Sequence, residues 1–93
     1  HPKYARALVN LTGVRRGQRL LDPFCGTGGI LIEAASIGVR AVGSDISPEM
    51  VEGCKSNLRH FGLEWDELTE ADVGVIDEMF DDITAVATDP PYG

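Results

Sequence analysis

The sequence predicts an α/β fold in which a doubly wound parallel sheet is covered by helices on both faces. Short apolar runs that suit buried strands alternate with stretches whose apolar residues repeat at helical spacing, as in βαβ units. Parallel strands need such crossovers, which are right-handed in nearly all proteins. The 93 residues allow one small domain with about four strands. Because open sheets of this kind are usually larger, we expect residues 1–93 to be the N-terminal half of a larger domain.

The first predicted elements are a short helix and a buried strand. Helical spacing indicates the helix over residues 3–11, which Pro2 can open and Gly13 can end. Its apolar face consists of Tyr4, Leu8 and Leu11. Residues 19–21 (RLL) then form the strand, and a glycine-rich turn follows over residues 22–28 (DPFCGTG).

Two further helices and a strand come next. The turn leads into a helix over about residues 29–37, which Gly38 can cap, and residues 39–44 (VRAVGS) form the second strand. Ser47 and the proline after it are an N-cap and a first helical residue, and Gly62 ends the helix that they begin. Its inner stripe, expected in the core, consists of Val51, Cys54, Leu58 and Phe61.

The last third is less regularly patterned. A short strand near Leu68 is expected before Asp72, and residues 73–80 (VGVIDEMF) fit a helical turn or a loop. Residues 83–88 (ITAVAT) form an apolar strand, which we expect to lie mid-sheet in a longer protein. The loop DPPYG follows it.

Charge and cysteine content limit the partners and the compartment. All eight Lys and Arg lie before residue 60, whereas ten of the fifteen acids lie after it, so the last third is a poor surface for phosphate backbones. A nucleic-acid substrate would need further parts of the protein. Cys25 and Cys54 are too far apart for a CxxC site, so we expect reduced thiols and no metal site. With no membrane span and no signal peptide in evidence, we expect a cytoplasmic protein.

The glycine-rich turn is the first candidate ligand site. In doubly wound sheets, ligands bind beyond the carboxyl ends of the strands, and Gly26 and Gly28 let the backbone approach a ligand. Leu31 stands where the dinucleotide fingerprint has its third glycine, and no lysine follows the turn, which disfavours NAD and a P-loop. The carboxylate of Asp22 instead suits a cationic cofactor with ammonium and sulfonium groups, namely S-adenosylmethionine. Phe24 and Thr27 complete the candidate residues of the turn.

Two acids further along can bind the rest of an adenosine. Asp45, at the end of the second strand, can accept both ribose hydroxyls, with Ile46 flanking the adenine. An Asx turn before Ser47 is an equally good reason for an aspartate there. Asp72 can accept from the adenine amino group, although a solvated charge is a strong alternative in so acidic a stretch.

The tetrapeptide Asp89-Pro90-Pro91-Tyr92 is the candidate catalytic motif. An exocyclic base amine is a weak nucleophile, and the Asp89 carboxylate with the Pro90 carbonyl can hold its two N–H groups and aim its lone pair. The prolines make the loop rigid. Tyr92 can stack on a flipped base, or it can simply pack at a loop edge.

Three motifs together resemble one family. DPFCGTGGILIEAA, GSDISPEMVEGCKSNLRHFG and TDPPYG, with the opening PKYARALVNLTGV, are similar to the THUMP-domain-associated tRNA guanosine-N2 methyltransferases over almost the whole chain. The resemblance implies a Rossmann-like class I methyltransferase fold with a seven-stranded sheet, an RNA-binding THUMP domain upstream, and methylation of guanosine N2 in tRNA.

The resemblance also implies roles for individual residues. Asp22, Gly26 and Gly28 would hold the methionine end of S-adenosylmethionine, Asp45 its ribose and Asp72 its adenine, and Asp89 would hold the target amine. Three alternatives remain open: a guanine N2 in rRNA, an adenine or cytosine amine in DNA or a glutamine amide, and a scaffold domain that binds nucleotides without catalysis.

Overall fold

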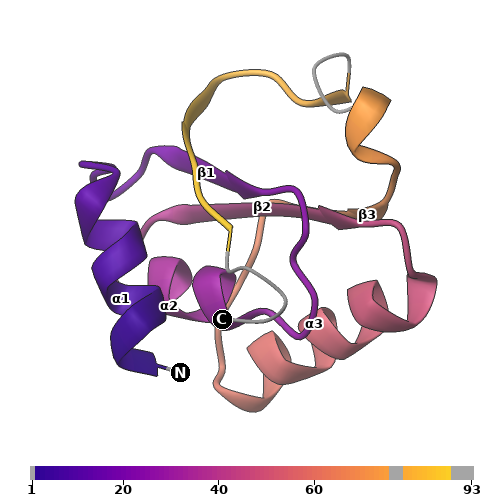
Figure 1. Cartoon of the computed structure of the whole chain (residues 1–93). Helices are drawn as coiled ribbons and strands as arrows, with labels where there is room; N and C mark the ends of the chain where they lie inside the picture. The colour runs from indigo at the N-terminus through magenta and orange to yellow at the C-terminus, as the bar shows by residue number, and fades with distance from the viewer. Residues whose placement is uncertain (1, 76–78, 89–93) are drawn as a thin grey trace.

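The computed structural model describes residues 2–75 and 79–88, which form a four-stranded parallel sheet with strand order β3-β2-β1-β4 (Figure 1). In chain order the elements are α1 (Pro2–Leu11), β1 (Arg19–Asp22), α2 (Gly29–Ser36), β2 (Arg40–Asp45), α3 (Pro48–His60), β3 (Glu67–Glu70), the 3-10 helix η1 (Val73–Val75) and β4 (Ile83–Val86). The predicted α/β class and parallel sheet are confirmed, and the strand near Leu68 exists.

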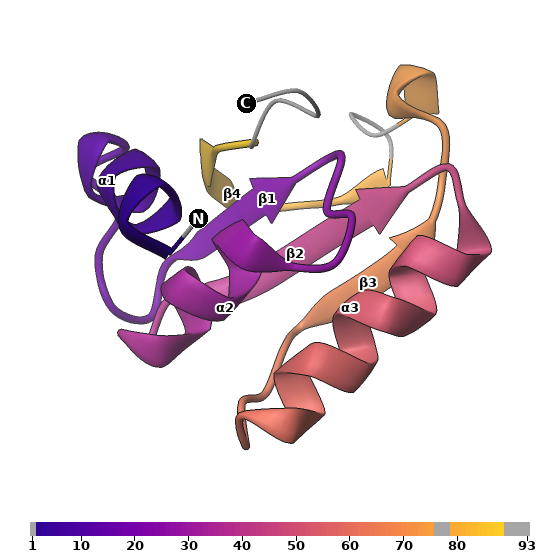
Figure 2. The same cartoon turned by 60° about the horizontal axis from the view of Figure 1, so that its bottom comes forward.

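The strand order determines where the helices lie. From β1 to β2 to β3 the chain moves in one direction, so right-handed crossovers place α2 and α3 on the same face, which α1 also covers (Figures 1 and 2). From β3 to β4 the chain crosses back past β1 and β2. This return passes the opposite face, where Phe80 packs on Leu21 and Val42. The direction in which successive strands are added to the sheet therefore reverses between β1 and β4. Open α/β sheets bind ligands at positions of this kind.

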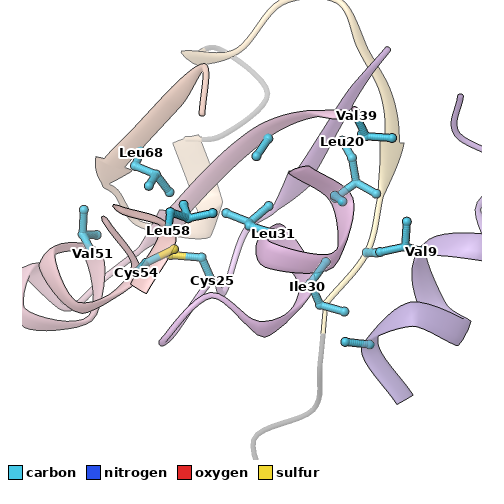
Figure 3. Close-up of a cluster of buried hydrophobic side chains, with 14 residues drawn as sticks. Val9, Leu20, Cys25, Ile30, Leu31, Val39, Val51, Cys54, Leu58 and Leu68 are labelled. Carbon is cyan, nitrogen blue, oxygen red and sulfur yellow. The ribbon is translucent and has the colours of Figure 1, made fainter. Parts of the chain in front are cut away.

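The main core lies between the sheet and the three helices (Figure 3). α2 and α3 contribute fully buried side chains, among them Leu31, Cys54 and Leu58. Alternation along each strand sends Leu20 into this core and Leu21 to the opposite face. None of the helices in the described part of the chain is long and apolar enough to cross a membrane.

The predicted apolar face of α1 was wrong in part, because Leu8 packs against the main core but Tyr4 and Leu11 do not. Tyr4 and Leu11 are 46% and 83% exposed, and the buried side chains are the smaller Ala5 and Val9. α1 lies against α2, and small residues at the contact allow two helices to approach closely. The ion pair from Arg6 on α1 to α2 lies at the rim of this contact.

Two predictions of element ends also need correction. Phe61 was assigned to the buried stripe of α3, but the helix ends at His60, so Phe61 falls in the capping turn and is 61% exposed. The last strand was predicted over residues 83–88 and ends at Val86. Its side chains alternate between half-buried and exposed, because in the described residues β4 pairs with β1 alone.

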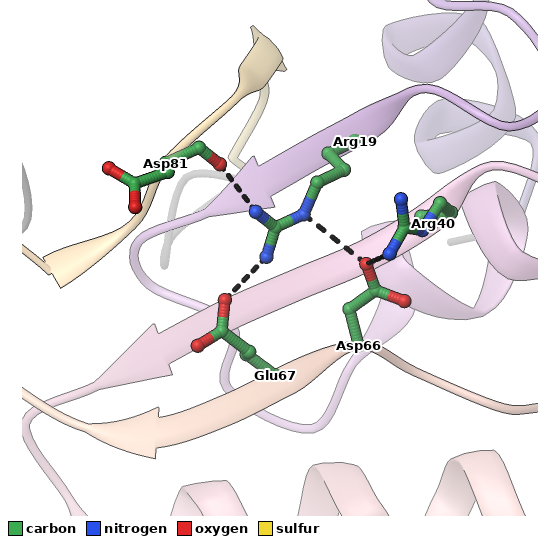
Figure 4. A network of polar contacts seen from close by, with 5 residues as sticks. All are labelled: Arg19, Arg40, Asp66, Glu67 and Asp81. Carbon is green, nitrogen blue, oxygen red and sulfur yellow. Dashed lines mark hydrogen bonds and ion pairs between the residues drawn. The ribbon is translucent and has the colours of Figure 1, made fainter.

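The amino end of the sheet is held by an ion-pair network (Figure 4). The guanidinium of Arg19 binds the carboxylates of Asp66, at 3.2 Å, and Glu67, and donates to the Asp81 carbonyl. Arg40 forms an ion pair with the same Asp66 carboxylate at 2.8 Å. The network therefore ties β1, β2, β3 and the segment before β4 together at one edge.

Candidate functional site

Three of the predicted acids gather at the carboxyl edge of the sheet. Asp22 ends β1 and Asp45 ends the neighbouring strand β2, while Asp72 follows β3 by two residues. Since the strands are parallel, their carboxyl ends share one edge, so residues 50 positions apart in sequence are placed in a row. The glycine-rich turn connects this row to the start of α2.

Asp22 lies beneath the turn and not at its surface. Its side chain is 1% exposed and one carboxylate oxygen accepts the N–H of Phe24 at 3.0 Å. Asp22 therefore shapes the turn from the inside. Its predicted contact with the methionine end of a cofactor remains a prediction.

The Asp45 carboxylate connects the glycine turn to the start of α3. One carboxylate oxygen accepts the N–H of Gly26 in the turn and the other accepts the N–H of Ser47 before α3, each at 3.0 Å. The Asx turn that sequence left open is therefore present, and the same side chain also holds the glycine turn. Each carboxylate oxygen still has a second lone pair for another donor, because an ionised carboxylate offers about four acceptor positions.

Phe24 and Ile46 flank these acids with apolar surface. Their side chains are 54% and 69% exposed, on the loops that follow β1 and β2. Exposed apolar side chains beside a polar row are a suitable surface for an aromatic base. The predicted role of Ile46 beside an adenine remains a prediction that this placement permits.

The turn itself has the conformation for which glycine is needed. Gly26 and Gly28 have φ of +53° and +97°, in the left-handed region. Gly28 caps α2 with no side-chain hydrogen bond to the first turn of the helix. The first N–H groups of α2 are therefore available to an anionic group, which a helix N-terminus also favours electrostatically.

Helix α3 supports the turn from below. A Cβ at Gly28 would lie 2.8 Å from the Cys54 sulfur, so the helix and the turn are in close contact. The side chain of Asn57 donates to the Thr27 carbonyl at 2.8 Å. Sequence reasoning assigned no role to Asn57, because its partner lies 30 residues away and no local pattern marks such a bond.

The two cysteines meet under the turn. Cys25 and Cys54 are both buried, and their thiols face one another (Figure 3). The hydrogen bond with Cys54, burial and the nearby carboxylates of Asp22 and Asp45 raise the pKa of Cys25 well above its usual value. Cys25 is 4% exposed and belongs to the main core, so this placement favours a packing role.

The remaining predicted residues contribute less to the described geometry. Asp72 is exposed and accepts the N–H of Gly74 at 2.9 Å, a local turn. Asp89, Pro90 and Tyr92 lie outside the described residues. Within 2–75 and 79–88, no group of three or more His, Cys, Asp or Glu is arranged to hold a metal ion.

Comparison with known proteins identifies the relatives of this chain. The model of the UPF0020 family, described as an RMKL-like methyltransferase domain, matches residues 1–93. The tRNA (guanine(10)-N2)-dimethyltransferase of Methanothermobacter thermautotrophicus is 53% identical over 92 residues, covering 99% of this chain and 27% of that protein. The U6 snRNA (guanine-N(2))-methyltransferase THUMPD2 of Bos taurus is 36% identical, covering 96% of this chain and 18% of that protein.

Two solved methyltransferase structures superpose on this chain. TrmN from Thermus thermophilus superposes with a TM-score of 0.87 and 30% identity, over 99% of this chain and 29% of that one. An RNA methyltransferase from Salinibacter ruber, solved with S-adenosyl-L-homocysteine, superposes with a TM-score of 0.79 and 25% identity, over 92% and 56% of the two chains. The chain thus spans about a quarter of the length of the Methanothermobacter thermautotrophicus relative, and it belongs to the RMKL-like methyltransferase domain family.

Proposed function

We propose that the protein containing this chain transfers the methyl group of S-adenosylmethionine to an exocyclic base amine, N2 of a guanosine in tRNA. The observation that carries the proposal is the hydrogen bond from the Gly26 N–H of the glycine turn to the Asp45 carboxylate. This bond lies at the carboxyl edge of the sheet, beside the point where the strand order reverses. The relatives named above, with their guanine-N2 substrates, support the same reaction.

The site residues fit the parts of this cofactor. Its ribose hydroxyls would donate to the two remaining lone-pair positions of Asp45, and the exposed side chains of Phe24 and Ile46 would flank its adenine and the apolar part of its chain. Its carboxylate would accept from the uncapped N–H groups at the start of α2. Asp22, buried under the turn, would favour its ammonium and sulfonium groups through charge rather than contact.

The catalytic role is proposed for Asp89, Pro90 and Tyr92. The chain before them still runs beside β1, because the Ala87 N–H donates to the Leu21 carbonyl at 3.0 Å. Asp89 follows Ala87 by two residues in the sequence, and we propose that it acts at the carboxyl edge, which holds the glycine turn. There Asp89 and the Pro90 carbonyl would hold the amine, and Tyr92 would stack on its base. The cofactor supplies the electrophilic methyl group, and positioning supplies most of the acceleration.

The choice of RNA rests on relatives rather than on this geometry. The archaeal relative is named for a tRNA substrate and the bovine one for U6 snRNA, whereas both are named for guanine N2. We infer that the reaction is the shared property and that tRNA is the first substrate to test. The free thiols Cys25 and Cys54 fit a reducing compartment, and we propose the cytoplasm.

The proposal is tested with the full-length protein and an Asp89→Ala variant. We expect methyl transfer to guanosine in tRNA by the unmodified protein, and a loss of at least about 100-fold in kcat for the variant, as for the removal of a positioning group. Affinity for S-adenosylhomocysteine should stay within about threefold. Glu64→Ala is the matched control, because Glu64 is an exposed acid near the amino edge of the sheet. Undiminished transfer by Asp89→Ala would contradict the catalytic assignment.

A further inference from the structure

Asn57 contacts the glycine turn from a different element, and its hydrogen bond has a specific consequence for α2. The Thr27 carbonyl lies four residues before Leu31, where it would normally accept the Leu31 N–H as the helix continues toward its N-terminus. In the described residues this carbonyl accepts instead from the Asn57 side chain, at 2.8 Å. Helix α2 begins at Gly29, after the N-cap Gly28, whose carbonyl accepts the Ile32 N–H at 2.8 Å.

The same bond fixes the orientation of one peptide plane. The Thr27 carbonyl and the Gly28 N–H belong to this plane, and the Gly28 N–H donates to the Cys25 carbonyl at 2.8 Å. With Asn57 on the carbonyl side, both polar groups of the plane are bound. Gly28, which follows this plane, has a left-handed φ of +97°, and α2 begins at the next residue.

We propose that Asn57 is a positioning residue for the cofactor: by holding the Thr27 carbonyl, it keeps the first N–H groups of α2 available to the carboxylate of the amino-acid part of S-adenosylmethionine. This inference rests on the proposed function. Asn57 does not itself contact the ligand in this account. Its effect should therefore be confined to ligands that carry the amino-acid part.

The test compares two ligands in the full-length protein. S-adenosylhomocysteine carries the amino-acid part, whereas 5′-methylthioadenosine has the same adenosine and thioether without it. Asn57→Asp keeps the side-chain shape but replaces the donor with an acceptor, and Asn57→Ala removes the donor. Ser56→Ala changes an exposed neighbour on α3 and is the matched control.

We expect both Asn57 variants to weaken binding of S-adenosylhomocysteine about tenfold, the effect of losing one hydrogen bond. Binding of 5′-methylthioadenosine should stay within about twofold. Equal losses for the two ligands would show a merely structural role and overturn the proposal, as would no loss for either. If the unmodified protein binds neither ligand, the proposed function fails as well. Should Asn57→Asp not fold, Asn57→Ala gives the same comparison.

Discussion

Both edges of the sheet carry carboxylates, but the groups that bind these carboxylates differ between the two edges. At the amino edge, Asp66 and Glu67 are paired with arginines, chiefly the largely buried Arg19. At the carboxyl edge, Asp45 and Asp72 accept backbone N–H groups and form no ion pair with a Lys or Arg of residues 2–75 and 79–88. The amino edge is thus a closed, stabilising network, and the carboxyl edge retains negative charge and acceptor positions for a cationic ligand.

The largest effect is expected from Gly28→Ala. The added Cβ would lie 2.8 Å from the Cys54 sulfur, at a φ of +97° that alanine rarely adopts, so we expect a loss of about 3 kcal/mol in stability together with weaker cofactor binding. Urea denaturation and calorimetry measure the two effects. Gly29→Ala is the matched control, since its Cβ meets nothing within 4 Å. Equal stability of the two variants would disprove the close contact of α3 with the turn.

Arg19→Met tests the amino edge. The change leaves Asp66 and Glu67 without their shared partner, although both are partly exposed and water offsets part of the loss, so we expect about 2 kcal/mol lower stability. Cofactor affinity should be unchanged within about twofold, because the network lies at the far edge. A variant that is fully stable but binds cofactor poorly would reverse the roles given to the two edges.

Asp72→Ala tests the least secure member of the carboxyl edge. If Asp72 accepts from the adenine amino group, its loss should weaken S-adenosylhomocysteine about fivefold, the effect of one exposed hydrogen bond. Stability should hardly change, because the side chain is exposed and serves a local turn. Unchanged affinity in calorimetry would assign Asp72 to that turn alone.

The smallest effect is expected from Arg6→Ala. Its ion pair with Glu33 spans 3.3 Å, and the arginine side chain is 68% exposed, so about 0.5 kcal/mol or less should be lost. Thermal unfolding in low and high salt measures this contribution. A loss as large as that of Arg19→Met would mean that exposure does not distinguish the two ion pairs.

Sequence could predict the features that depend on residues close together in the chain, such as helix ends and turns. Gly28 and Gly38 frame α2, and Ser47 with the proline after it begins α3 as expected, with its side chain accepting the Met50 N–H. The glycine turn and Asp45 were located from their positions after predicted strands. Chain order and parallel pairing were sufficient to place them at one edge.

What sequence could not predict depends on partners far along the chain. The Asn57 bond spans 30 residues and the contacts of Arg19 span 47 or more, distances at which no periodicity connects the partners. Arg19 begins a buried strand, and nothing in the local sequence indicates that its side chain is mostly buried in an ion-pair network. Part of the buried face of α1 was also missed, because helical spacing shows which residues share a face but not which face a neighbouring helix covers.

The most direct test of the central claim measures binding of S-adenosylhomocysteine to the full-length protein by calorimetry, with one acid changed at each edge. Asp45→Ala removes a carboxylate that joins the turn to α3, and Asp66→Ala removes one from the amino-edge network. We predict that Asp45→Ala weakens binding at least about tenfold, whereas Asp66→Ala lowers the melting temperature and leaves the affinity within about twofold. Unchanged affinity in Asp45→Ala, or equal losses in both variants, would contradict the assignment of the cofactor site to the carboxyl edge.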